Sequence, residues 1–298
     1  MPTITIGVPV FNGAALLEES LSCLARQTFA DFQVLIFDNA STDATPEIAQ
    51  AWVARDSRFR HVRQPSNVGG IANFRDALMA ADTPWFLWRA DDDLSDDDYL
   101  EKLHDLTMKH ADCRLAVSTI VSCDLDGANR RVYPPPAGGD SVSVRGRMRT
   151  LIEYAPSWFY GLWDTETARK ACLPVLANYP FANASDHLML YGPIIDGALR
   201  STADTQFVQR IQRTATTRRE KKRYSAAQLL DMRRIYLREL RRIRSERKIS
   251  FGLCAALMAI QPIYLRRRLP SLSKIARTRV RELLGLSGHT SSPIPQDT

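Results

Sequence analysis

The feature that most constrains the fold is an alternation of apolar strand patterns with helical patterns over the first third of the chain. One strand pattern, Phe32–Phe37, is continuously apolar, as in parallel strands that are buried on both faces. Strands are predicted at residues 4–10, 32–37, 60–64 and 85–88, with helices between them at 14–27, 46–54 and 70–81. This order predicts an α/β fold with a doubly wound, mostly parallel sheet and helices on both of its faces.

Each of three of these strands is followed by its own cluster of polar residues at the point where the strand ends. Asn12-Gly13 follows the first strand, Asp38-Asn39 the second and Asp91–Asp93 the fourth. In doubly wound sheets, ligands bind beyond the carboxyl ends of the strands, where the connecting loops meet. We therefore expect the three clusters to contribute to one site.

The three adjacent aspartates, Asp91–Asp93, are unusual because neighbouring like charges repel unless a positive group lies among them. A divalent cation supplies such compensation, and Mg²⁺ or Mn²⁺ commonly bridges one or two carboxylates to the phosphates of a substrate. The alternative is that Asp91–Asp93 and Asp96–Asp98 are acids favoured by the dipole at a helix N-terminus. We favour the cation for Asp91–Asp93, and both interpretations stay open for Asp96–Asp98.

A pair of glycines, Gly69-Gly70, lies between the third predicted strand and the helix that follows it. Such a junction allows backbone N–H groups to approach a phosphate at the helix N-terminus. An ordinary turn is the alternative. The position of the pair shortly before the aspartates favours a phosphate contact.

Together these segments resemble a family 2 glycosyltransferase with the GT-A fold. The resemblance rests on IGVPVFNGAALLEESLSCLARQTFADFQVLIFDNASTD, SNVGGIANFRDAL and WFLWRADDDLSDDDYLEKL, which occur in the family's order and spacing. It covers residues 4–103, and residues 104–213 match more loosely. It implies an inverting glycosyltransferase that uses a nucleotide-sugar donor and a divalent cation, Mn²⁺ or Mg²⁺.

The resemblance also implies roles for individual residues around the donor. Asp38 would hydrogen-bond the base, and Asp91 and Asp93 would be the metal-binding DxD pair, with Asp92 also at the donor. Ala90 stands where the family often has a further aspartate, which leaves the direct ligand open among the aspartates, and Asp93 is favoured. The other implied donor-site residues are Pro9, Phe11, Asn12, Asn39, Asn67, Gly69, Gly70 and Asn73.

The implied catalytic base is Asp186, which resembles the family's second acidic motif with Ser185 in place of its first acid. A base must accept the proton of the acceptor hydroxyl as that oxygen attacks the anomeric carbon opposite the departing diphosphate. Two alternatives are that Asp186 caps a helix and that His187 is the base.

Farther along, residues 209–213 occupy the place where relatives carry an Arg and a His that close over the diphosphate, and here the His is missing.

Aromatic faces suit the apolar faces of sugar rings, and the resemblance implies that the aromatic residues upstream of Asp186 line the acceptor side. Packing in the core is the alternative. The residues concerned are Trp158, Tyr160 and Trp163.

The C-terminal part of the chain differs in charge from the rest. Residues 214–268 contain 16 basic and 4 acidic side chains, whereas residues 1–213 carry a net charge of −7. Arginines alternate with apolar residues at 229–247, a basic amphipathic pattern typical of segments that lie on anionic membranes. The apolar run 251–265 is too short to span a bilayer and favours an interfacial helix or a packed hairpin.

We therefore predict a GT-A catalytic domain at 1–213, a basic helical, membrane-associating extension at 214–285 and a disordered tail at 286–298. The expected reaction moves a sugar from a UDP- or dTDP-sugar to a saccharide or lipid-linked saccharide acceptor, in bacterial surface polysaccharide assembly. The chain opens on a strand pattern instead of a secretory signal, and its five cysteines form no CxxC pair. These features favour a cytoplasmic protein, peripheral on the inner face of the membrane.

Two other protein classes, nucleotidyltransferases and nucleic-acid-binding proteins, share some of these features. A nucleotidyltransferase would use a similar sheet and paired aspartates, but would carry a Gly-rich basic loop after the first strand, which Pro9–Gly13 lacks. A nucleic-acid-binding protein would use the basic extension on phosphates. The acidic charge of residues 1–213 argues against it, and no nucleic-acid partner is expected.

Overall fold

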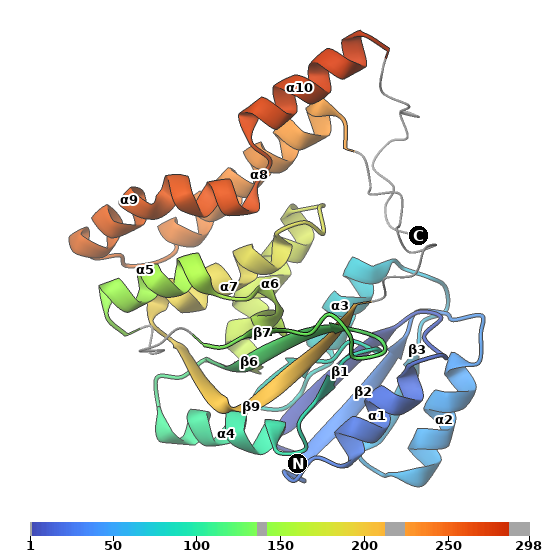
Figure 1. Ribbon diagram of the computed structural model, residues 1–298. Helices are drawn as coiled ribbons and strands as arrows, with labels where there is room; N and C mark the ends of the chain where they lie inside the picture. The colour runs from blue at the N-terminus through green and yellow to red at the C-terminus, as the bar shows by residue number, and fades with distance from the viewer. Residues whose placement is uncertain (1, 136–141, 212–223, 286–298) are drawn as a thin grey trace.

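The computed structural model describes residues 2–135, 142–211 and 224–285. A nine-stranded sheet forms its centre, in the order β3-β2-β1-β4-β8-β6-β9-β5, with β7 paired to β6 (Figure 1). Four parallel strands make up one half of the sheet, and β1 and β2 are buried throughout. They are β1 (Ile4–Val10), β2 (Phe32–Asp38), β3 (Phe59–Arg63) and β4 (Trp85–Trp88). The predicted mostly parallel α/β sheet is confirmed.

The second half of the sheet mixes both directions. β8 (Leu162–Asp164) runs antiparallel between β4 and β6 (Leu115–Asp124), and β7 (Arg131–Tyr133) is antiparallel to β6. The long strand β9 (Leu199–Ile211) lies parallel to β6, and β5 (Leu94–Ser95) pairs with it in the antiparallel sense. Because β5 directly follows Asp91–Asp93, this pairing brings the end of β9 to the aspartates.

The first three helices follow from the strand order. The chain moves outward from β1 to β2 and β3, and then returns past β1 to β4. Right-handed crossovers therefore place α1 (Leu17–Ala25) and α2 (Thr45–Arg55) on one face and α3 (Gly70–Met79) on the other. The reversal makes the crevice between β1 and β4 the expected binding position.

Helices cover both faces of the other half of the sheet. α4 (Tyr99–Lys109) lies on the α1 side, where Phe29, just after α1, contacts His104 with ring centroids 4.7 Å apart. The layer on the α3 side consists of α5 (Val144–Glu153), the 3₁₀ helix η1 (Pro156–Tyr160), α6 (Thr165–Asn178) and α7 (Ser185–Asp196), and α6 packs on α3. Trp88 on β4 stacks on Phe159 of η1 with ring centroids 4.4 Å apart. This contact joins the two halves of the core.

Polar residues near the starts of two helices serve in tertiary contacts. Thr45 lies inside α2, and its hydroxyl accepts the N–H of Gly13 at 2.9 Å and donates to Asp43. Asp96 precedes α4, which begins at Tyr99, and accepts hydrogen bonds from Gln206 on β9. This contact assigns Asp96 a structural role.

Three helices form the C-terminal arm, residues 224–285, which lies along the top of the molecule in Figure 1. They are α8 (Ala226–Ser245), α9 (Phe251–Arg268) and α10 (Leu272–Leu283). α8 packs on α6 and α7, α9 packs on α5, and α10 packs on α8. The predicted domain boundary at 213 and the predicted tail at 286–298 lie outside the described residues.

The arm is continuous with the main hydrophobic core. The apolar side of α8 is buried there through Met232, Tyr236, Leu240 and Ile243. The sequence predicts that this side is available to a membrane, but it packs on α6 and α7 instead. The arm is therefore a structural part of the molecule.

Leu240→Ala tests this continuity. Removing a buried leucine side chain typically costs 2–5 kcal/mol, and we expect the whole protein to unfold in one transition at lower urea concentration. Leu230→Ala is the matched control, because Leu230 lies on the same helix and is 50% exposed, so its change should stay within about 0.5 kcal/mol. A separate early transition in Leu240→Ala would show that the arm unfolds independently.

Candidate active site

The acidic turn, Asp91–Asp93, lies between β4 and β5 and is held by Arg210 of β9. Asp93 is buried, and its Oδ1 accepts the backbone N–H of Arg210 at 2.9 Å. The guanidinium of Arg210 donates to the carbonyl of Asp92 and to the carboxylate of Glu19 on α1. Its remaining nitrogen, Nη2, is buried without a hydrogen-bond partner among the described residues.

Gly13, in the loop after β1, makes room for the carboxylate of Asp91. A Cβ atom at position 13 would lie 2.1 Å from Oδ2 of Asp91 and 2.6 Å from Cγ2 of Val10. Only glycine permits so close an approach. The loops that follow the adjacent strands β1 and β4 thus meet at this point, as the strand order predicts.

The carboxylates of the acidic turn are strongly perturbed. Burial raises the pKa of Asp91 to about 7 and that of Asp93 to about 7, and the negative charge of Asp92 raises both further. Burial also raises the pKa of Asp92. The charge of Arg210 lowers all three in part, and the completely buried Arg89 also lowers that of Asp93. Without a further cation, these groups hold protons near neutral pH.

The donor set suits a cation that is shared with a ligand. Among residues 2–135, 142–211 and 224–285, no group of three or more His, Cys, Asp and Glu side chains is arranged to hold a metal ion. Two hard carboxylates next to an open crevice are the usual protein contribution to Mg²⁺ or Mn²⁺ when phosphate oxygens complete the coordination. Asp91 and Asp93 fit this pattern.

The loops after β1 and β2 are tied together. The backbone N–H of Asn12 donates to Ser41 at 2.9 Å, and Asn12 Oδ1 accepts the N–H of Thr42 at 2.8 Å. Both Asn12 and Ala40 have positive φ angles, of 52° and 59°. The predicted polar clusters after β1, β2 and β4 therefore come together at one edge of the sheet.

Asp38 organises the loop after β2. It is completely buried, its Oδ1 accepts the N–H of Ser41 at 2.8 Å, and its Oδ2 accepts a hydrogen bond from Arg63 at 2.6 Å. Burial by itself would raise its pKa, but the hydrogen bonds from Ser41 and the charge of Arg63 hold the pKa below its usual value. Contact with a nucleotide base would require one of these bonds to be exchanged, so that role stays a prediction.

Asn39 joins the end of β2 to the loop before α3. Its Nδ2 donates to Asn67 Oδ1 at 2.8 Å, and its Oδ1 accepts the N–H of Val68 at 2.8 Å. Asn67 Oδ1 also accepts the N–H of Gly69, whose φ of 85° favours glycine. The Asn39 and Asn67 side chains thus shape the Gly69-Gly70 turn.

The remaining predicted donor residues differ in exposure. Gly70 begins α3, and a Cβ there would meet no described atom within 4 Å, so the helix N-terminus is open. Asn73 is buried and donates to the carbonyl of Phe37 at 2.8 Å. Pro9 is buried in β1, whereas Phe11 is exposed. Phe11 is therefore the more accessible of the two to a ligand.

Asp186 lies in the first turn of α7 and does not cap the helix. Ala184 occupies the N-cap position with a φ of 66°, and Asp186 Oδ1 accepts the N–H of His187 at 2.7 Å. Burial raises the pKa of Asp186, while the N–H of His187 and the charge of Arg268 lower it in part. A raised pKa suits a carboxylate that must take up a proton.

His187 belongs to a buried cluster that the arm helps to build. Its Nδ1 lies 2.5 Å from the hydroxyl of Tyr154 on α5, and its carbonyl accepts from Tyr264 of α9 at 3.4 Å. Arg268, at the end of α9, lies over the Tyr154 and Tyr264 rings and donates to the carbonyl of Leu151. Burial and then the charge of Arg268 lower the pKa of His187 to about 3, which makes it a weak proton acceptor.

Tyr160 links the two acidic parts of the site. Burial raises the pKa of its phenol well above the usual value, and the negative charges of Asp93, Asp92, Asp186 and Asp91 raise it further. Its ring stacks on Phe207 of β9, with centroids 5.2 Å apart. The Tyr160 phenol is thus within electrostatic reach of both the acidic turn and Asp186.

The two tryptophans predicted on the acceptor side are core residues. Trp158 is buried and its indole N–H donates to the carbonyl of Ser118, and Trp163 is buried and donates to that of Phe159. Neither ring has surface to offer a sugar, because both lie between the sheet and the helical layer. Tyr160 remains the predicted acceptor residue of the three.

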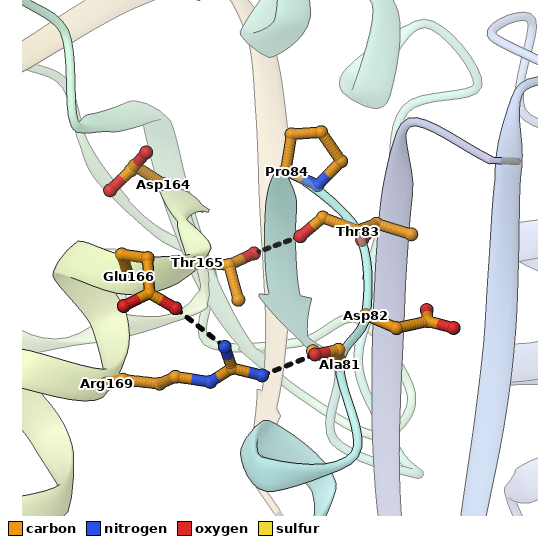
Figure 2. Close-up of a pocket in the computed structure, with 8 residues that line it drawn as sticks. All are labelled: Ala81, Asp82, Thr83, Pro84, Asp164, Thr165, Glu166 and Arg169. Atoms are coloured by element: carbon orange, nitrogen blue, oxygen red, sulfur yellow. Dashed lines mark hydrogen bonds and ion pairs between the residues drawn. The ribbon is translucent and has the colours of Figure 1, made fainter.

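A cavity lies elsewhere in the structure. It measures about 470 Å³ and lies beside the start of β4, at the opposite end of that strand from the acidic turn (Figure 2). Its carboxylates already have partners: Glu166 binds Arg169 at 2.7 Å, Asp164 caps α6, and Asp82 accepts a hydrogen bond from Gln33. It is lined by Ala81, Asp82, Thr83, Pro84, Asp164, Thr165, Glu166 and Arg169. The perturbed carboxylates mark the acidic turn as the better candidate.

Sequence reasoning missed Glu19 and Arg268 and did not foresee how Arg210 is used. Arg268 sits in a run of three arginines that suggested a membrane contact, yet it turns into the core. Its position four residues after Tyr264, on the same side of a helix, was the available signal. The contact between Glu19 and Arg210 joins distant parts of the chain and carries no local signal.

Comparisons with known proteins identify the family and the fold. The sequence profile described as "Glycosyl transferase family 2" matches residues 5–158. The uncharacterized glycosyltransferase EpsJ of Bacillus subtilis is 29% identical over 160 residues, which is 52% of this chain and 44% of EpsJ. An uncharacterized glycosyltransferase of Haemophilus influenzae is 30% identical over 129 residues, 43% of this chain and 50% of that protein. The chain spans about half the length of these curated relatives.

Solved structures with the same fold include two glycosyltransferases. TarS 1–349 of S. aureus in complex with UDP matches with a TM-score of 0.60 at 16% identity, over 80% of this chain and 65% of that one. Mannosyltransferase PcManGT from Pyrobaculum calidifontis, in complex with GDP-Man and Mn²⁺, matches with a TM-score of 0.52 at 17% identity, over 96% and 81%. The expected GT-A fold is confirmed.

The pKa values of Asp91 and Asp93 predict how stability depends on pH. Between 3.8, the usual aspartate value, and about 7, the folded protein holds protons that the unfolded chain has released. The free energy of unfolding of the metal-free protein should therefore fall as pH rises through this window. The measurement is urea denaturation of the wild type and of Asp91→Asn/Asp93→Asn at several pH values. The difference in the free energy of unfolding between the two proteins gives the contribution of these two carboxylates. A difference between the two proteins that does not change with pH would contradict the prediction.

Proposed function

The chain belongs to glycosyl transferase family 2, and we propose that it transfers one sugar from a nucleotide-diphosphate donor to an acceptor hydroxyl with inversion at the anomeric carbon. The observation that carries the proposal is the acidic turn, whose carboxylates meet the loops after β1 and β2 at the crevice of the sheet. Donors with UDP or dTDP are favoured. The TarS structures hold UDP or UDP-GlcNAc and the PcManGT structure holds GDP-Man.

Asp91 and Asp93 would hold the cation together with the donor's diphosphate. When bound, Mn²⁺ or Mg²⁺ neutralises the charge that develops on the leaving diphosphate. The protein contributes a turn whose geometry Arg210 and Gly13 set in advance. The unpartnered Nη2 of Arg210 and the open N-terminus of α3 are further donors for phosphate oxygens.

Asp186 is the proposed general base. The acceptor hydroxyl attacks from the side opposite the diphosphate, and its proton passes to the Asp186 carboxylate. Burial, the cause of its raised pKa, favours that proton transfer, whereas the neighbouring His187 is a poor acceptor at neutral pH. The charges of both acidic groups raise the pKa of Tyr160, which supports placing the acidic turn and Asp186 around one site.

The proposed acceptor is a saccharide or a lipid-linked saccharide, and the proposed setting is bacterial surface polysaccharide assembly on the inner face of the membrane. Family analogy supports the setting. The rival nucleotidyltransferase loses support, since the matching family consists of glycosyl transferases. The transferred sugar is proposed to be a hexose or deoxyhexose.

A nucleotide screen tests the donor site. We expect UDP or dTDP, added with Mn²⁺ or Mg²⁺, to raise the melting temperature of the full chain, because a ligand that binds only the folded state stabilises it. GDP serves as the comparison nucleotide, and EDTA should remove the effect. If no nucleotide gives a metal-dependent shift, the enzyme proposal is wrong.

Two substitutions separate the base from the metal site. Asp186→Asn should lower turnover at least ~100-fold while nucleotide binding stays near normal, because a general base contributes about 10²–10⁴-fold. Asp93→Ala should weaken nucleotide and Mn²⁺ binding together. The measurements are product formation and calorimetric titration of each variant. Near-normal turnover by Asp186→Asn would rule out the base assignment.

A further inference from the structure

Helix α9 is apolar on both sides, although one of its sides faces outward. Its inner side, with Leu253, Leu257 and Tyr264, is buried in the core. Phe251 is 91% exposed and Met258 is 65% exposed. All exposed positions from 251 to 263 are apolar or small: Phe251, Gly252, Cys254, Ala255, Met258, Ala259, Pro262 and Ile263. The outward side of a surface helix is normally polar, so this outer face of α9 calls for a partner.

Helix α10 presents a similar stripe. Leu272, Ala276, Val280 and Leu283 are exposed and recur at spacings of four, four and three residues, which places them on one side of the helix. Ile275 faces the other way and packs against α8. Figure 1 shows α9 and α10 as the outermost layer of the arm, on the side away from the sheet. The outer face of α9 and the α10 stripe can therefore meet one extended surface.

The charges around these apolar residues select an anionic partner. Residues 224–285 contain 15 basic and 4 acidic side chains. Exposed Lys248 precedes the outer face of α9 and exposed Arg266 follows it, while Arg277 and Arg281 are exposed on α10. A second copy of so basic an arm would repel the first. Nucleic acid would satisfy the charges but would leave the apolar side chains in water, because its binding surfaces are polar.

We propose that the outer face of α9 and the α10 stripe form the docking surface for an anionic lipid bilayer. The apolar side chains enter the boundary between headgroups and acyl chains, and the basic side chains contact the headgroups. No helix in the described part of the chain is long and apolar enough to cross a bilayer, so both helices lie in the plane of the interface. The Arg-rich α8 is not the inserting helix, because its apolar side is buried in the core.

This surface is connected to the proposed acceptor side of the site. Arg268 at the end of α9 donates to Leu151 of α5, and Tyr264 of α9 donates to the carbonyl of His187, the neighbour of Asp186. If the proposed function holds, a lipid-linked acceptor would reach Asp186 from the bilayer on which α9 lies. This last step rests on the proposed function, whereas the docking surface itself does not.

Vesicle binding by the full chain tests the surface. Wild type should sediment with vesicles of equimolar phosphatidylcholine and phosphatidylglycerol, and much less with phosphatidylcholine alone. Phe251→Glu/Met258→Glu should weaken partitioning to the anionic vesicles by about tenfold for each substitution, because two apolar side chains are lost from the interface. Both positions are exposed, so the fold and melting temperature should be retained.

Met108→Glu is the matched control, because Met108 is 71% exposed on α4, outside the arm. This variant should bind vesicles like wild type. The proposal is overturned if the double variant binds vesicles as well as wild type does. It is also overturned if the two substitutions only convert a dimer to a monomer. The metal-dependent nucleotide shift, measured on the same proteins, should be unchanged. Its absence in wild type would count against the enzyme proposal alone and leave the docking result standing.

Discussion

Three adjacent carboxylates withdrawn from water at the end of β4 are the constraint on which the rest of the site depends. Burial raises the pKa of each carboxylate, and the charge of Asp92 adds to the effect on Asp91 and Asp93. Arg210 and, for Asp93, Arg89 compensate only in part. The compensation draws on distant segments, since β9 must return to β5 and α1 must supply Glu19. A cation bridged to a diphosphate would balance the remaining negative charge.

The parts of the fold that could be predicted from the sequence are those with local signals. Three of the four parallel strands, β1, β2 and β4, show as mostly apolar segments, and the polar loops that end them meet as the strand order requires. The clamp by Arg210 could not be predicted, because it depends on β9 pairing with a strand more than a hundred positions earlier. Trp158 and Trp163 suggested sugar-binding faces, and only their buried surroundings identify them as core.

The arm is a second part of the chain whose packing could not be predicted from its sequence. Its alternation of arginine and apolar residues is typical of a membrane helix, and composition alone cannot say which apolar side chains are already used in packing. In α8 they are used, and in α9 they exceed what the core can cover. Arg268 belongs to the same basic run as Arg266 but contributes to the cluster beside Asp186. One helix thus stabilises the acceptor side and carries the surface that remains to be covered.

The burial of α9 against α5 has a consequence for the order in which the molecule is completed during synthesis. The Tyr154 ring and the Leu151 carbonyl are contacted by Arg268 of α9, which is synthesised more than a hundred positions later. A nascent chain that has emerged only as far as α8 therefore has the whole parallel half of the sheet but lacks these contacts on α5. We expect the final packing of the α5–α7 layer to follow the synthesis of α9.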